Sequence, residues 1–326
     1  MNDRDIEVLT QYELEVLSTR RGRGAWIVET GQGTKLLREY RGTVKRLNFE
    51  NQVLGQLEQT TVERYVPNKE GELLSQAPDG THFIVKDWYQ ERECSLKDVD
   101  EIRRTTAHIA RLHRELRKIE WQEEWAMGSS LPESIAGEME RHNRELRRAR
   151  TFIRDKKKKT EFEWCVIGNY ETFYREAKEA CEGIQKLEEK CETNEGQYLC
   201  HGDLNQHHIL MKGQDAIFLE FGRMHLGLQM TDLYQFMRKV MEKHDWNLEL
   251  GQSILDIYSK ILPVNDYERR VLYYMFLYPE KYWKQINFYI NMNKAWIPEK
   301  NVEKLHKLEE QEESRCYFLE HILTWK

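Results

Sequence analysis

The chain has 326 residues, of which 40% are hydrophobic and 33% are charged, and its formal net charge is −6. This composition excludes an intrinsically disordered chain and fits either one bilobed domain or two domains. The charged start N-D-R-D-I-E-V-L is not typical of a signal peptide, and no apolar run approaches the roughly 18 residues of a membrane-spanning helix. We therefore expect a cytoplasmic protein without a membrane partner.

Six cysteines lie far apart and form no C-x-x-C pair. This spacing favours reduced thiols over a zinc site or a disulfide framework. Acidic and basic residues are interleaved along the chain, so we expect no nucleic-acid partner. The lysine run from Lys156 to Lys159 is interpreted as a solvated loop between helices.

The first part of the chain alternates short apolar runs with turn residues, which predicts a small antiparallel sheet. Within it, R-G-R-G from Arg21 precedes an apolar run, and a Gly31-Gln32-Gly33 turn follows. Gly22 and Gly24 are predicted to lie on a glycine loop whose backbone N–H groups can approach phosphates. Two ordinary hairpin turns are the alternative, because G-x-G alone is a weak signal.

The next strand, Lys35 to Tyr40, is followed by a helical pattern from Arg46. Kinases carry a nucleotide-binding lysine on such a strand and its glutamate partner on the following helix. Arg38 occupies the lysine position and Glu50 is available as the partner. Lys35 should point to the opposite face of the strand, and a planar guanidinium does not replace an ammonium group. An ordinary surface ion pair between Arg38 and Glu50 is the alternative.

Strand-like segments continue to Trp88, and from Leu96 onward apolar residues recur at helical spacing. The chain is therefore predicted to be an α+β protein, with a strand-rich N-lobe at residues 1–93 that holds one helix and a helical C-lobe at residues 94–326. Further helices are predicted at residues 132–153, 170–190, 229–244, 248–261, 267–277, 280–293 and 298–323.

The segment Tyr198 to Phe221 interrupts these helices. It predicts a polar loop at His201-Gly202-Asp203, a strand around His208 to Met211, and a second strand that ends near Glu220. Three polar side chains, Asp203, His208 and Glu220, could then converge on one cleft. Phosphoryl transfer needs such a set, with one carboxylate to accept the hydroxyl proton and two ligands to hold Mg²⁺.

This segment resembles the catalytic segment H-G-D-x-x-x-x-N followed by I-D-F or I-D-W of the aminoglycoside phosphotransferase and choline kinase superfamily. His201, Gly202 and Asp203 match, whereas His208 stands at the asparagine position and Glu220 at that of the metal-binding aspartate. The resemblance implies a bilobed protein-kinase-like fold, with an antiparallel-sheet N-lobe, a mostly helical C-lobe that carries the hairpin at 198–221, and a nucleotide cleft between them.

Two later stretches narrow the resemblance: T-D-L-Y-Q-F-M-R-K-V-M-E-K from Thr231 and Y-P-E-K-Y-W-K-Q-I-N-F-Y from Tyr278. Together with R-G-R-G-A-W and F-E-N-Q near the start, they are similar to the spore-coat CotS-type family of endospore-forming bacteria, a kinase-like branch of the superfamily. This similarity implies synthesis in the sporulating mother cell, deposition in the spore coat and other coat proteins as partners. It also implies that Asp232 supports the catalytic loop.

Asp203 is the candidate general base, and a loop-capping aspartate is the alternative. We expect His201 to brace the catalytic loop from the core. Glu220 is an oxygen ligand suited to Mg²⁺, whereas the imidazole of His208 suits softer metals. His207 and His208 should not hold one ion together, because neighbours on a strand face opposite sides.

Three kinase positions, Arg38, His208 and Glu220, therefore depart from the family pattern. We expect a degenerate site that binds ATP and Mg²⁺ weakly or not at all, in a structural or binding component of the coat that takes at most a small-molecule or nucleotide ligand. The alternative is an active ATP-dependent phosphotransferase that acts on a small-molecule hydroxyl or a coat partner.

Overall fold

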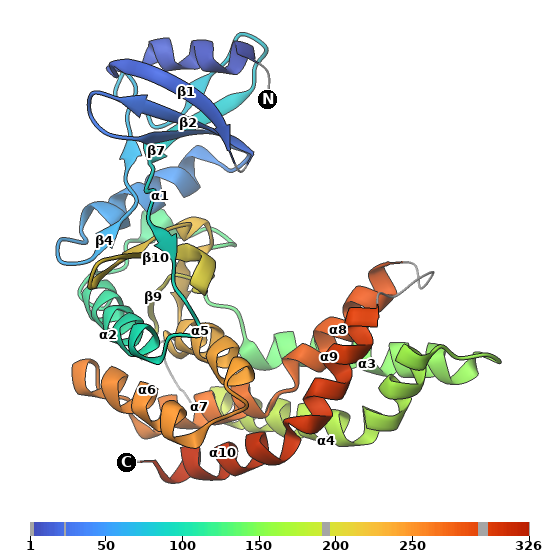
Figure 1. Ribbon diagram of the computed structural model, residues 1–326. Coiled ribbons are helices and arrows are strands. Elements are labelled where there is room, and N and C mark those ends of the chain that lie inside the picture. Colours follow the sequence, from blue (N-terminus) through green and yellow to red (C-terminus); the bar gives the residue numbers. More distant parts are fainter. Residues whose placement is uncertain (1–2, 23, 191–195, 293–298, 326) are drawn as a thin grey trace. The chain divides into compact units, whose positions relative to one another are not determined.

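The computed structural model describes residues 3–22, 24–190, 196–292 and 299–325. The chain forms two compact units (Figure 1). The sheet unit comprises residues 1–95, 104–131 and 199–225, and the helical unit comprises residues 96–103, 132–198 and 226–326. This division follows packing, and it groups the 198–221 hairpin with the N-terminal strands. The lobe boundary between residues 93 and 94 stays a prediction.

The sheet unit begins with a 3-10 helix, η1 (Asp3–Gln11), which the strand pattern does not predict. An antiparallel sheet follows, with the order β1-β2-β3-β7-β5 and with β6 also paired to β7. Its strands are β1 (Val16–Gly22), β2 (Ala25–Thr30), β3 (Lys35–Glu39), β5 (Tyr65–Val66), β6 (Ser75–Gln76) and β7 (His82–Asp87). Alternate residues such as Trp26, Leu37 and Val85 share one buried cluster with Val8 and Leu9 of η1, so η1 covers one face of the sheet.

Helix α1 (Val44–Gly55) begins where the Thr43 side chain accepts a hydrogen bond from the Arg46 N–H, which satisfies one of the free amides of the first turn. A second, four-stranded sheet has the order β4-β11-β10-β8, and β9 and β12 form a two-stranded sheet. The bounds are β4 (Thr61–Val62), β8 (Arg92–Glu93), β9 (Tyr198–Cys200), β10 (Ile209–Lys212), β11 (Asp215–Phe218) and β12 (His225–Gly227). The hairpin of β10 and β11 follows the His201-Gly202-Asp203 loop, as the sequence predicts.

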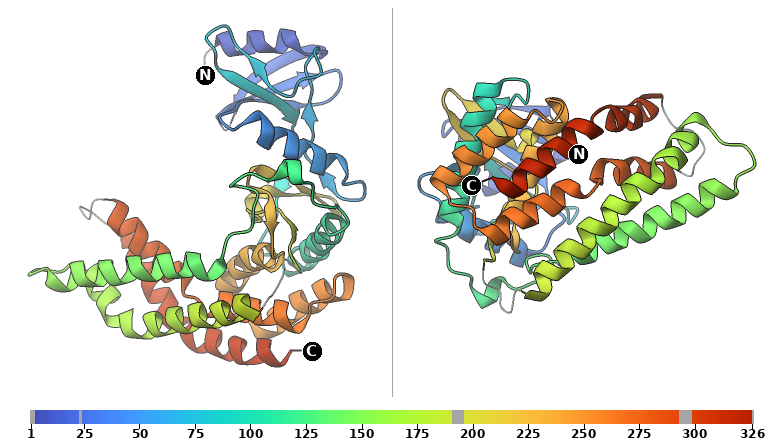
Figure 2. Two further views of the ribbon diagram at one scale, coloured as in Figure 1. Left: turned by 180° about the vertical axis from the view of Figure 1, so that it is seen from behind. Right: turned by 90° about the horizontal axis from the view of Figure 1, so that it is seen from below.

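Long helices dominate the remainder (Figures 1 and 2). They are α2 (Val99–Leu116), α3 (Ile135–Asp155), α4 (Glu161–Lys190), α5 (Met230–Lys243), α6 (Leu248–Ile261), α7 (Asp266–Leu277), α8 (Glu280–Asn291), α9 (Glu299–Glu310) and α10 (Glu312–Thr324). The bounds of α6 agree with the prediction. Helix α4 begins nine residues earlier than predicted. The single helix expected at 298–323 is wrong, because α9 and α10 are separated at Gln311.

The break at Gln311 has a tertiary cause. The Gln311 side-chain amide donates to the Glu242 carbonyl at 2.8 Å and to the Asp245 carboxylate at 2.6 Å. These partners hold the residue against the end of α5, and neither proline nor glycine marks the position in the sequence. No described helix is both long and apolar enough to cross a membrane. The five cysteines in the described ranges are free thiols, and Cys191 lies outside those ranges.

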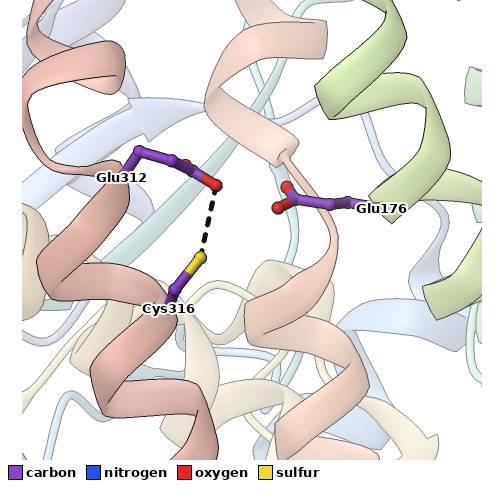
Figure 3. Close-up of side chains that lie close together, drawn as sticks. All are labelled: Glu176, Glu312 and Cys316. Carbon is purple, nitrogen blue, oxygen red and sulfur yellow. Dashed lines mark hydrogen bonds between the residues drawn. The ribbon is translucent and has the colours of Figure 1, made fainter.

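One polar cluster lies in the helical unit, where the buried Glu176, the half-buried Glu312 and the exposed Cys316 place their ligand atoms within 4.8 Å of one another (Figure 3). Arg315 occupies this cluster: its guanidinium donates to Glu176, to Glu312 at 3.1 Å, and to the Phe276 carbonyl at 3.1 Å. Burial raises the pKa of the Cys316 thiol to about 11. With a cation already in place and a protonated thiol, the cluster is a clamp that ties α4, α7 and α10 together.

Replacing the clamp cation should cost much of the stability of this unit. Arg315→Met leaves the buried Glu176 carboxylate without its guanidinium, so the free energy of unfolding should fall by about 3–5 kcal/mol. Arg144→Met is the control, because Arg144 and Glu140 form an exposed pair on α3 that should contribute at most about 0.5 kcal/mol. Urea titrations of both variants measure the difference. Equal losses would show that Arg315 is not a clamp.

Candidate functional site

The candidate catalytic loop, His201-Gly202-Asp203, turns at a glycine. Gly202 has φ +82°, and a Cβ at this position would lie 2.1 Å from the Arg223 carbonyl oxygen. Glycine alone combines a left-handed backbone with so close an approach. The loop therefore turns sharply between β9 and Asp203.

His201 is fully buried beside this turn. One ring nitrogen, Nε2, lies 2.9 Å from the Leu219 carbonyl, and the other, Nδ1, accepts from the Asp203 N–H at 3.2 Å. Since a carbonyl can only accept, the proton of the neutral ring belongs on Nε2. The ring thus joins the loop to the end of the β11 segment, and its geometry supports the bracing role expected of it.

Asp203 keeps a partly exposed carboxylate, with 37% of its side chain accessible. The Asn205 amide donates to the Asp203 carboxylate at 3.0 Å and to its carbonyl at 3.1 Å, while the Asn205 oxygen accepts from the His207 N–H at 3.0 Å. Asn205 thus fixes the candidate base and caps the short helix after it. Sequence reasoning missed this residue, although an asparagine two places after the aspartate was the available signal.

His208 lies at the end of a 3-10 helix, η3 (Gln206–His208), so the predicted strand at this residue is wrong and β10 begins at Ile209. Its Nδ1 is 2.8 Å from the Asp203 carbonyl, which places a proton on Nδ1. The neighbouring His207 ring lies 2.7 Å from the Glu93 carboxylate. The two rings have different partners, and the cap by Asn205, not strand alternation, separates them.

Glu220 follows β11 in a left-handed conformation, with φ +63°, which is uncommon for a residue other than glycine. The Glu63 carboxylate stabilises this backbone by accepting the Glu220 N–H at 2.8 Å. Lys86 donates to Glu63 at 2.7 Å and to the Glu220 carboxylate at 2.9 Å. Arg38 donates to both Glu220 oxygens, at 3.0 and 2.9 Å. We call Arg38, Glu63, Lys86 and Glu220 the Glu220 network.

The Glu220 network pairs two basic side chains, Arg38 and Lys86, with two carboxylates. Glu63 is 2% and Lys86 4% exposed, whereas the side chains of Arg38 and Glu220 are 46% and 37% exposed. Burial alone would raise the pKa of Glu220, but Lys86 and Arg38 outweigh it and lower this pKa to about 2. Glu63 and Glu220 in turn raise the pKa of Lys86 against the effect of its burial. Glu220 and Lys86 are therefore both charged at neutral pH.

The predicted partnership of Arg38 and Glu50 is wrong. Glu50 is bound within its own helix and by the sheet, since it accepts from Arg46 at 2.6 Å and from the Tyr65 hydroxyl at 2.6 Å. Lys35 pairs with Asp87 at 2.7 Å. The guanidinium of Arg38 is thus left for Glu220, which lies 182 residues away in the sequence.

Lys86 and Glu63 are network residues that the sequence analysis did not identify. Leu36 pairs with Lys86 and Arg38 pairs with Ile84 across β3 and β7. This register places Lys86 near Arg38. The available signal was a charged residue inside the apolar run F-I-V-K-D, since a lysine in a buried strand is rarely without a carboxylate partner.

Gly22 and Gly24 form the turn between β1 and β2, where Gly22 pairs with Ala25. Gly24 has φ +71°, and a Cβ there would meet nothing within 4 Å. Glycine therefore suits this position because of its left-handed backbone conformation, and not because a side chain would clash. Arg23 lies outside the described residues. The phosphate-binding role of the two glycines stays a prediction, as does the supporting role of Asp232, which is fully buried in α5.

The side chains do not fit a magnesium ion held by Glu220 and His208. Both oxygens of Glu220 already accept from cations. Within the described ranges, the group of three ligand atoms within 4.8 Å belongs to Glu176, Glu312 and Cys316, not to the catalytic loop. A divalent cation would have to displace Arg38 or Lys86, so the arrangement can hold Asp203 near a hydroxyl but does not organise a metal beside it.

Several solved structures share this fold. An aminoglycoside phosphotransferase from Alicyclobacillus acidocaldarius superposes with a TM-score of 0.84 at 15% identity, covering 97% of this chain and 94% of the other. A spectinomycin phosphotransferase in complex with ADP and spectinomycin gives 0.63 at 11% identity, covering 96% and 97%. An amicoumacin kinase in complex with AMP-PNP and Ca²⁺ gives 0.62 at 11%, covering 97% and 94%.

These likenesses confirm the predicted kinase-like α+β fold, with an antiparallel sheet in the N-terminal region and a mostly helical C-terminal part. No curated protein matches the chain. The model of the phosphotransferase enzyme family matches residues 15–270, which include the glycine turn, the catalytic loop and the Glu220 network. The chain therefore belongs to the phosphotransferase enzyme family.

Proposed function

We propose that this chain is a kinase-fold protein whose phosphotransferase site is closed by its own side chains, and that it serves as a structural or binding component of the spore coat. The observation that carries the first part is the Glu220 carboxylate, which is bound by Arg38 and Lys86. Positioning and electrostatic stabilisation supply most of the catalysis in phosphoryl transfer. A site in which Arg38 and Lys86 already bind the carboxylate that should hold the metal can neither position the phosphates nor stabilise their charge.

The coat assignment rests on the stretches that begin at Thr231 and Tyr278 and on their similarity to the CotS-type family. Fractionation of sporulating cells that produce the tagged chain tests it. We expect the chain in the mother cell and then in the coat extract of purified spores. Recovery only from the medium of growing cells would contradict the assignment without bearing on the closed site.

An active ATP-dependent phosphotransferase is the second candidate function, and one observation favours it. The loop around Asp203 keeps an ordered carboxylate, fixed by Asn205 and His201 and open to solvent. The acceptor would then be the hydroxyl of a small molecule or of a coat partner. A nucleotide would enter the site with its metal only if the Glu220 network opened.

The variant Asp203→Ala separates the two functions. A closed site gains little from this base, so any trace of ATP turnover should stay within about twofold of that of the unaltered chain, whereas a working kinase should lose at least about 100-fold. Steady-state release of ADP measures the rates. Asp215→Ala, on the exposed start of β11, is the control and should have no effect in either case. A large loss confined to Asp203→Ala would establish the enzyme.

A further inference from the structure

The turn between α3 and α4 carries a charge opposite to that of the whole chain. Residues 147–164, which we call the basic tip, contain eight Lys and Arg against three Asp and Glu, in a chain of net charge −6. The tip comprises the end of α3 and the first turn of α4, and it lies at the outer end of the helical unit in both views of Figure 2.

Part of this charge is used inside the tip. Lys156 pairs with the buried Glu163, and Lys159 donates to the carbonyls of Arg154 at 3.1 Å and Lys156 at 2.8 Å, which closes the end of α3. The exposed Arg148, Lys157 and Lys158 have no hydrogen-bond or ion-pair partner in the described part of the chain. Their charges face solvent and remain available to a ligand.

Exposed aromatic side chains lie on the tip beside the two lysines that are paired within it. Trp164 is 60% and Phe152 37% exposed. The Lys159 ammonium lies 5.3 Å from the Trp164 ring, and the Lys156 ammonium lies 5.7 Å from the Phe152 ring. Single exposed apolar residues need no explanation, but two exposed aromatic rings on the same short segment as the free Lys157 and Lys158 indicate an interaction site.

The end of α8 adds to this group. Tyr289 contacts the tip, since its hydroxyl donates to Glu163 and its ring lies 5.3 Å from that of Phe162. Beside Tyr289 in the sequence, Phe288 and Met292 are 39% and 48% exposed. Exposed apolar side chains from α3, α4 and α8 therefore gather at the same end of the helical unit as the free cations.

We propose that the basic tip binds the anionic surface of a lipid bilayer. Tryptophan with lysine and arginine is the combination that suits the membrane interface, where the ring enters the headgroup region and the ammonium groups meet lipid phosphates. The acidic remainder of the chain is repelled by such a surface, so the electrostatic field turns the tip toward it. The sequence predicts a solvated loop and no membrane partner; the exposed Trp164 and the apolar end of α8 change that interpretation.

Nucleic acid is the less suitable anion. A phosphate backbone is followed by cations spaced along a groove, with aromatic rings stacked on successive bases. Here the free cations Lys157 and Lys158 are adjacent on one turn, and they are not spaced along a groove. The basic tip, with the exposed Trp164 and Phe152 among its cations, fits an interface into which the rings can insert.

Co-sedimentation of the full chain with vesicles tests the proposal. We expect binding to phosphatidylcholine vesicles that contain about 30 mol% phosphatidylserine and none to phosphatidylcholine alone. Binding should weaken strongly at about 0.5 M salt, because salt then screens the attraction between the lysines and the lipid phosphates over a few ångströms. The pair Lys157→Gln and Lys158→Gln should lower the partition coefficient by about 25-fold, at roughly fivefold per lysine, and Trp164→Ser should lower it further.

The matched control is Lys178→Gln with Lys186→Gln, which removes the same charge from exposed positions elsewhere on α4. It should leave binding unchanged, and circular dichroism verifies that each variant is folded. The proposal is overturned if the unaltered chain does not bind anionic vesicles, or if the control variant loses as much vesicle binding as the tip variant. It is also overturned if the chain binds single-stranded DNA more tightly than the vesicles. The salt series on the unaltered chain decides the matter even if a variant does not fold. Neither outcome depends on phosphotransfer.

Discussion

Lys86→Met lowers the free energy of unfolding by about 3–5 kcal/mol, the cost of removing one partner from a buried ion pair. Methionine retains the apolar stem of the lysine, so the loss comes from the charge. Glu63, only 2% exposed, is left in the interior without its cation, and Glu220 keeps only the half-exposed Arg38. Guanidinium titrations of the variant and the unaltered chain measure the difference.

Lys35→Met is the matched control on the neighbouring strand. Lys35 pairs with Asp87, and the two side chains are 13% and 24% exposed, so water can solvate the remaining carboxylate and the loss should be about 1 kcal/mol. The double change Lys86→Met with Glu63→Gln should recover part of the lost stability, because it no longer buries an unpaired charge. If Lys86→Met and Lys35→Met lose equal stability, the Glu220 network is not the ionic core of this site.

The combined change Arg38→Lys, His208→Asn and Glu220→Asp should tighten Mg²⁺-dependent ATP binding by at least about tenfold. The shorter side chain at position 220 moves its carboxylate away from residue 38. An ammonium group at position 38 suits a phosphate better than a guanidinium does. An amide oxygen at position 208 suits Mg²⁺ better than imidazole does. Calorimetric titration with and without Mg²⁺ measures the ratio of the two affinities.

Arg38→Lys alone is the control for this gain. A lysine at position 38 can still pair with Glu220, and Lys86 keeps its own bond of 2.9 Å to that carboxylate, so the single change should create no dependence on Mg²⁺. If the combined variant shows the same ratio of affinities as the unaltered chain, the three substituted positions are not what closes the site.

Local sequence patterns predicted most of the secondary structure of this protein. The helical period predicts the bounds of α6, and the polar loop between apolar runs predicts the hairpin of β10 and β11, because both depend on neighbours in the sequence. The 3-10 turn at His208 escaped prediction because the Asn205 side chain, and not a backbone propensity, sets it. A cap of this kind converts what looks like the start of a strand into a turn.

The chemistry of the site could not be predicted so directly. The sequence pattern paired Arg38 with Glu50, but Arg46 and Tyr65 hold Glu50, so Arg38 pairs with Glu220. Lys86 reaches Glu220 across 134 residues. Such pairings depend on the register of β3 and β7 and on the path of the loop after β11, which no short-range pattern encodes.

Calorimetric titration of the unaltered chain with ATP, once in Mg²⁺ and once in EDTA, tests the closed site most directly. Arg38 and Lys86 already neutralise Glu220, so ATP should either give no binding heat or bind with affinities that differ by at most about twofold between the two conditions. Mg²⁺ that tightens ATP binding more than about tenfold, together with turnover in the ordinary kinase range of about 1–100 s⁻¹, would contradict the account.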